Sequence, residues 1–162
     1  MKSAEFKYQQ LKIDSRWKIV KNEFIDLEPD NDYPIDEVFF YFDEDILQAT
    51  FDDYLVDLGF YGGYLQNERC GFFKIVVLKG NFLEGELLES FISRSSEIIR
   101  EKLNFYFEGI PNGLLSNVKG IKIENGNGFK ARHIYSAVEK ISYRLTSNQL
   151  KNLSKAKNEN ST

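Results

Sequence analysis

The residues of this sequence with the greatest capacity for chemistry are carboxylates, and they gather in one part of the chain. No Lys or Arg occurs between Asn22 and Glu68, and that window holds fourteen Asp and Glu residues. The remainder carries eleven acids and all 21 basic residues, so a window of charge −14 is set against a remainder of charge +10. The net charge of −4 conceals this asymmetry. A surface of one sign steers a partner of opposite sign, which favours a basic partner.

Tyrosines are interleaved with the acids in the second half of this window. Tyr offers a large contact area with a polar tip, and carboxylates add charge complementarity, a combination typical of protein–protein interfaces. The partner-binding residues predicted on this basis are Asp43, Glu44, Asp45, Asp52, Asp53, Tyr54, Asp57, Tyr61 and Tyr64. The strand register decides which face of a sheet carries them, and the sequence leaves that register open. The alternative is a solvated acidic face without a partner.

A calcium site is a second possibility for these carboxylates. The segment 26–37 places acids at positions 1, 3, 5, 7 and 12, which are ligand positions of an EF-hand loop. Position 6 is Asn31 instead of Gly, and Pro29 and Pro34 interrupt the loop. The flanks also favour strands, where an EF-hand has helices. We therefore expect an exposed acidic loop without a bound metal, and we expect no cofactor.

Three other arrangements could carry catalysis. His133 is the only histidine, so any Ser–His or Cys–His mechanism would need it, but a lone His where a helix begins is typical of a surface or capping residue. The segment 126–131 resembles a dinucleotide-binding loop, but no βα unit follows it. Cys70 is the only cysteine, which excludes an intrachain disulfide and a cysteine zinc site. We expect no catalytic residues, with carboxylate or metal-dependent catalysis within 26–57 as an alternative.

The elements that must position these residues follow from the apolar pattern. Strands are predicted over residues 17–27, 38–42, 54–61, 70–79 and 87–93, with a shorter one near 118–123. The strands 54–61 and 70–79 are predicted to form an antiparallel hairpin. The acids Asp43–Asp45 are predicted to cap a helical turn over 46–48. Helices are predicted from Ser95 or Ser96 to about Phe107, and over 131–145.

The predicted fold is therefore α+β, a mostly antiparallel sheet with two main helices in the C-terminal half. A length of 162 residues fits one domain, which we place at 1–153. Residues 154–162 are too polar to bury, and we expect a disordered tail. No apolar run approaches the roughly 20 residues that span a bilayer, and the N-terminus lacks the apolar segment of an export signal. We expect a cytoplasmic protein.

Short motifs along residues 17–93 point to a family. They are Phe24-x-Asp26-x-x-Pro29, Asp45-Ile46-Leu47, Asp57-Leu58-Gly59-Phe60-Tyr61-Gly62, Gly71-Phe72-Phe73-Lys74-Ile75-Val76-Val77 and Asn81-Phe82. In these motifs the chain resembles bacterial immunity proteins of contact-dependent growth inhibition and related polymorphic toxin systems. The resemblance implies an antitoxin that binds and neutralises a cognate toxin domain in the cytosol. Many such toxins are nucleases with basic clefts, which an acidic inhibitor would complement.

The basic C-terminal third supports a second class of function. Residues 119–157 hold nine Lys or Arg and two acids, so the helix predicted there could contact nucleic-acid phosphates. Its basic residues are dispersed around the helix, and the acidic window would repel a phosphate backbone. We therefore expect a 1:1 complex with a basic toxin domain, and a nucleic-acid-binding module is the alternative.

Overall fold

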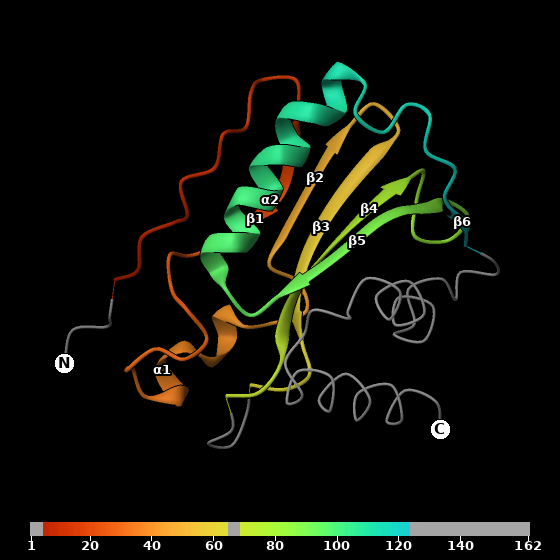
Figure 1. The fold of residues 1–162 in the computed structure, drawn as a ribbon. Coiled ribbons are helices and arrows are strands. Elements are labelled where there is room, and N and C mark those ends of the chain that lie inside the picture. The colour runs from red at the N-terminus through yellow and green to blue at the C-terminus, as the bar shows by residue number, and fades with distance from the viewer. Residues whose placement is uncertain (1–4, 65–68, 124–162) are drawn as a thin grey trace, which may run out of the picture.

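The computed structural model describes residues 5–64 and 69–123, and this part of the chain forms a six-stranded antiparallel sheet (Figure 1). The strands are β1 (Lys18–Asn22), β2 (Leu47–Phe51), β3 (Tyr54–Tyr61), β4 (Phe72–Lys79), β5 (Glu86–Ser93) and β6 (Ile121–Lys122). Each strand pairs with the next along the chain, so the sheet is a simple meander. The predicted α+β class with an antiparallel sheet is confirmed.

In the described residues, two α-helices and two short 3-10 helices accompany the sheet. They are α1 (Ile35–Val38), η1 (Phe39–Tyr41), α2 (Ser96–Gly109) and η2 (Ile110–Asn112). Figure 1 shows α2 lying along one face of the sheet, with α1 beyond one end of the strands. The helix predicted over 131–145 and the tail predicted over 154–162 lie outside the described residues.

The main core lies between α2 and the sheet. Alternate residues of β3 and β4 face the helix, and the register pairs Val56 with Val77, Leu58 with Ile75, and Phe60 with Phe73. The helix contributes Ile99, Leu103, Tyr106 and Phe107 to the same cluster. Fully burying one such side chain stabilises a fold by about 1.5–3 kcal/mol, so this contact holds α2 against the strands.

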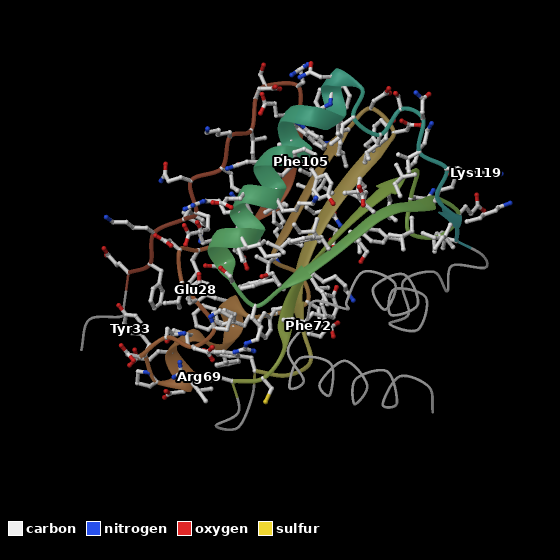
Figure 2. The ribbon with its side chains drawn as sticks, viewed as in Figure 1. Glu28, Tyr33, Arg69, Phe72, Phe105 and Lys119 are labelled. Atoms are coloured by element: carbon white, nitrogen blue, oxygen red, sulfur yellow. The ribbon has the colours of Figure 1, made fainter. Side chains whose placement is uncertain are left out.

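The start of α2 is capped from two directions. The Ser95 side chain accepts a hydrogen bond from Ile98 N at 3.2 Å, which confirms the predicted N-cap. The carboxylate of Glu28 accepts hydrogen bonds from Ser96 N at 2.9 Å and from Ser96 Oγ at 2.8 Å. Glu28 lies at the N-terminal end of α2 (Figure 2), where a negative charge complements the helix dipole. The loop before α1 is thereby tied to α2.

The opposite face of the sheet carries a second buried cluster. Its members are Leu55, Phe72, Val76, Leu78, Leu87 and Ile123. Because successive strand residues point to opposite faces, Asp57 of β3 and Lys74 of β4 share this face, and both are buried. Strand alternation therefore places two ionisable groups among apolar side chains.

The hairpin prediction is confirmed, since β3 and β4 pair from Tyr54↔Lys79 to Tyr61↔Phe72. The strand predicted over 17–27 ends earlier, at Asn22. The Asn22 side chain accepts a hydrogen bond from Phe24 N at 3.0 Å, and this local turn takes the chain out of the β1–β2 ladder.

Two predictions around the acidic residues are wrong. Residues 38–42 are not a strand, because the chain enters α1 after Pro34 and continues through η1. The fixed φ of Pro34 and the acids Asp36 and Glu37 in the first turn favour a helix start, and a short apolar run fits a helix or a strand equally. Residues 46–48 form no helical turn, since Leu47 begins β2.

Candidate functional site

Strand β3 divides the predicted acidic residues into two groups. Asp43–Asp45, here called the acidic loop, precede β2 and lie beside the C-terminal half of β3. The pair Asp52 and Asp53 forms the turn between β2 and β3, at the other end of the strand. With a rise of about 3.3 Å per residue, the two groups lie roughly 20 Å apart along β3. They are therefore two separate surfaces.

The acidic loop is fixed to β3 by backbone hydrogen bonds. Phe60 N donates to Asp43 O at 2.7 Å, and Ile46 N donates to Leu58 O at 3.0 Å. The side chains of Asp43, Glu44 and Asp45 are nevertheless exposed. The sheet therefore presents these three carboxylates on a rigid support.

The acidic loop forms one wall of a pocket of about 330 Å³, here called the aromatic pocket. The rest of the lining comes from η1, from the end of β3 and from the segment that follows β3. The lining includes Phe39, Phe40, Asp43, Glu44, Tyr61 and Tyr64. Three segments separated in the sequence therefore bring aromatic rings and carboxylates together.

The rings of η1 are exposed yet held in place. Phe39 and Phe40 are 42% and 51% exposed, which is unusual for adjacent phenylalanines in a packed protein. The Phe40 and Tyr41 ring centroids lie 4.2 Å apart, and Tyr41 meets Phe6 edge-on at 5.2 Å. These contacts fix the rings, so Phe39 and Phe40 offer apolar area without a large ordering cost.

Tyr64 supports the back of the pocket. Its ring stacks on Phe42 at 4.2 Å, and its hydroxyl donates to Pro29 O and accepts from Asn31 Nδ2, both at 3.1 Å. Burial raises the pKa of Tyr64. Tyr64, predicted to contact a partner, is thus buried in the fold and positions the pocket wall.

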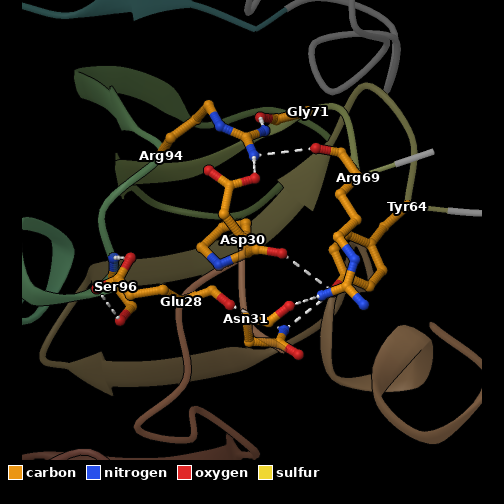
Figure 3. Close-up of polar contacts among 9 residues, drawn as sticks. Glu28, Asp30, Asn31, Tyr64, Arg69, Gly71, Arg94 and Ser96 are labelled. Carbon is orange, nitrogen blue, oxygen red and sulfur yellow. Dashed lines mark hydrogen bonds and ion pairs between the residues drawn. The ribbon is translucent and has the colours of Figure 1, made fainter. Parts of the chain in front are cut away.

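Two arginines anchor the loop that precedes α1 (Figure 3). Arg94 lies 2.7 Å from the Asp30 carboxylate and donates to Arg69 O at 2.9 Å and to Gly71 O. Arg69 donates to the backbone carbonyls of Asn31 and Tyr33. These contacts join the loop to the connection between β3 and β4, and so set the position of η1 over the pocket.

Two of the acids that suggested a calcium site form contacts with other parts of the fold. Glu28 caps α2 and Asp30 pairs with Arg94, so neither carboxylate points into a shared loop interior. Across residues 5–64 and 69–123, no group of three or more His, Cys, Asp or Glu side chains is arranged to hold a metal ion. Glu28 and Asp30 therefore have structural roles, and the acids of 26–37 are exposed, as predicted.

Asp57 and Lys74 form a buried ionisable site behind the pocket. Desolvation raises the pKa of Asp57 to about 7, opposed by a hydrogen bond from Gln48 Nε2 at 3.3 Å. Burial lowers the pKa of Lys74 to about 7, opposed by the charges of Glu44 and Asp57. Lys74 Nζ lies 3.8 Å from the centroid of the Tyr61 ring. Asp57 was predicted to contact a partner, but in the fold it is buried.

The turn between β2 and β3, formed by Asp52 and Asp53, lies close to the charge of Lys79. Asp52 adopts a left-handed backbone conformation with φ 52°, which Asp tolerates better than most residues. Asp53 O accepts from Gly80 N at 2.6 Å, and its carboxylate lies 4.0 Å from Lys79 Nζ. Lys79 Nζ also lies 6.0 Å from the ring of half-buried Tyr54. The charge of this turn is therefore partly offset within the fold.

The sequence did not single out Phe39, Phe40 or Lys74 as site residues. Four consecutive aromatic residues, 39–42, indicated a buried strand, and only their helical conformation leaves Phe39 and Phe40 exposed. A lysine inside the apolar run 72–78 was the visible sign of a buried charge. His133, the loop 126–131 and the basic helix lie outside the described residues.

Within the described part of the chain, no helix is long and apolar enough to cross a membrane. Comparison of the chain with protein-family models, with curated proteins and with solved structures gives no significant match.

Proposed function

We propose that this protein is an immunity-type inhibitor that binds a basic toxin domain 1:1 in the bacterial cytosol and neutralises it. The observation that carries the proposal is the aromatic pocket, whose lining combines the exposed aromatic residues Phe39 and Phe40 with the exposed acids Asp43 and Glu44. Aromatic anchors surrounded by charge are typical of the residues that dominate protein–protein affinity.

The charge distribution supports a basic partner. Asp45 lies 3.0 Å from Lys21, whereas Asp43 and Glu44 line the pocket. Asp36 and Glu37 of neighbouring α1 are exposed as well. This end of the molecule therefore carries acids from two segments, which would accelerate encounter with a basic surface.

The residues that carry the resemblance to immunity proteins also support the proposal. The motif Asp57–Gly62 contributes its last three residues to the pocket lining, and the motif Asp45–Leu47 begins with the last residue of the acidic loop. An inhibitor needs a preformed surface rather than a reactive group, and backbone hydrogen bonds hold this surface in place. Neutralisation by binding is the function that these features favour together.

Co-expression with the toxin domain encoded beside this gene tests the proposal. The wild-type protein is expected to co-purify with the toxin and to restore growth. Phe40→Ala is expected to weaken both effects at least tenfold, which corresponds to about 1.4 kcal/mol. Phe105→Ala is the matched control, since Phe105 is 49% exposed on α2. Absence of a complex between the wild-type protein and the toxin would overturn the proposal.

A further inference from the structure

We propose that the aromatic pocket receives an arginine side chain of the basic partner, a recognition step that rests on the proposed function. The pocket combines two features that rarely coincide on a surface. Exposed aromatic residues and exposed acids both belong to its lining. A guanidinium is the protein side-chain group that uses both, because it is planar, stacks on rings and donates from a rigid fork.

Phe39 and Phe40 are the rings that remain open for stacking. The Tyr61 ring already has Lys74 Nζ at 3.8 Å from its centroid, and the Tyr64 ring has Arg69 Cζ at 5.9 Å. A second cation on those rings would meet a like charge. The phenylalanines are 42% and 51% exposed, so part of each ring is accessible to the incoming group.

Asp43 and Glu44 supply the hydrogen-bond acceptors. A guanidinium binds a carboxylate through two parallel N–H donors, whereas an ammonium is a compact point charge without that geometry. The pocket wall beneath the carboxylates includes the buried rings of Phe42 and Phe60. Apolar surroundings weaken dielectric screening, so an ion pair here is stronger than one in open solvent.

The pocket is organised before binding. Phe39 and Phe40 meet edge-on at 5.8 Å, and Phe40 packs on Tyr41 at 4.2 Å. Glu44 O accepts from the Tyr61 hydroxyl at 3.4 Å, which holds the acidic loop against β3. Because walls and rim are already ordered, little conformational entropy is lost when a side chain enters.

Three blocked pentapeptides test this inference without a partner protein. They share the sequence Gly-Ser-X-Ser-Gly, with Arg, Lys or citrulline at X, where citrulline keeps the shape of Arg and removes its charge. Each is titrated into the ¹⁵N-labelled full chain, and the amide signals of Glu44, Gly62 and Gly63 are followed. The Arg peptide is expected to shift these signals saturably. The Lys and citrulline peptides are expected to bind at least about threefold and about tenfold more weakly.

Variants of the protein test whether the shifts of the amide signals arise from peptide binding in the pocket. Phe40→Ala and Glu44→Gln are expected to weaken the binding of the Arg peptide at least about fivefold. Asp52→Asn and Phe105→Ala are matched controls on other surfaces and are expected to leave it unchanged. The remaining amide signals report whether each variant is folded. The inference is overturned if the Arg peptide shifts no pocket signal, if Arg and Lys peptides bind alike, or if Glu44→Gln binds like wild type.

The result separates this inference from the proposed function. A toxin complex that forms although the Arg peptide leaves the pocket signals unchanged overturns arginine recognition and leaves neutralisation standing. If the Arg peptide binds in the pocket but no toxin complex forms, the proposed inhibitor function is overturned, and the inference that the pocket binds arginine is supported.

Discussion

The backbone carbonyl of Glu44 occupies the space that a side chain on Gly59 would fill. A Cβ atom at Gly59 would lie 2.3 Å from Glu44 O, far inside the contact distance of two non-bonded atoms. The acidic loop can therefore pack this closely against β3 only because the strand has no side chain at Gly59. This relationship brings the carboxylates of the loop to the rim of the aromatic pocket.

Gly59→Ala is expected to lower the free energy of unfolding by about 3 kcal/mol, because a backbone atom must move to admit the methyl group. The comparison variant is Gly63→Ala, where a Cβ meets nothing within 4 Å and only the φ of +105° is unfavourable. Its expected cost is about 1 kcal/mol. Urea denaturation measures both, and equal costs would contradict the contact with Glu44.

Glu28→Gln is expected to destabilise the protein by about 1 kcal/mol, because the carboxylate caps α2 and complements the helix dipole. The control is Glu97→Gln, since Glu97 forms an exposed i,i+3 pair with Arg100 at 3.7 Å. That change is expected to cost less than about 0.5 kcal/mol. Thermal unfolding compares the two variants, and a silent Glu28→Gln would show that the cap contributes nothing.

Asp57→Asn is expected to remove one part of the pH dependence of stability. The folded-state pKa of Asp57 is about 7 against 3.8 for the ordinary carboxyl, so the folded protein retains a proton that the unfolded chain releases. Wild-type stability therefore falls relative to that of Asp57→Asn as the pH rises from about 4 to about 7. Denaturation at several pH values measures the difference, and a constant difference would contradict the raised pKa.

Arg94→Lys is expected to cost about 1–2 kcal/mol despite the retained charge. One guanidinium joins Asp30, Arg69 O and Gly71 O, and an ammonium cannot reproduce that planar set of donors. Hydrogen exchange is expected to accelerate at residues 30–33, since Arg94 holds Asp30 directly and also binds the backbone of Arg69, which contacts Asn31 and Tyr33. Wild-type exchange rates in that loop would show that Arg94 does not position it.

The two acidic groups are expected to affect association unequally. Asp43→Asn together with Glu44→Gln should slow association with the toxin domain at low ionic strength, because these carboxylates face solvent at the pocket. Asp52→Asn together with Asp53→Asn removes the same charge about 20 Å away and should have the smaller effect. Stopped-flow association rates test this, and equal slowing would favour long-range charge over the pocket.

The hairpin of β3 and β4 was predictable because its signal is local. Both strands are rich in apolar residues of the aromatic and β-branched types that favour strands, and glycines mark the connection between them. The helix start at Ser95 was predictable for the same reason, since an N-cap depends on side chains within one turn.

The aromatic pocket was not predictable, because tertiary contacts build it. Its walls come from η1, the acidic loop and residues 60–64, and their meeting depends on Arg69 and Arg94 holding a distant loop. Asp57 is buried because β3 is a central strand with both faces covered, and that coverage comes from elements distant in the sequence. The short run 38–42 carried too little periodicity to distinguish a helix from a strand.

Titration calorimetry of the neighbouring toxin domain with the full chain tests the central proposal most directly. The expected result is a 1:1 complex whose affinity falls as ionic strength rises from about 50 to about 200 mM, and which Phe40→Ala weakens while Phe105→Ala does not. The contradicting result is the absence of binding heat and of a 1:1 complex at the lower ionic strength.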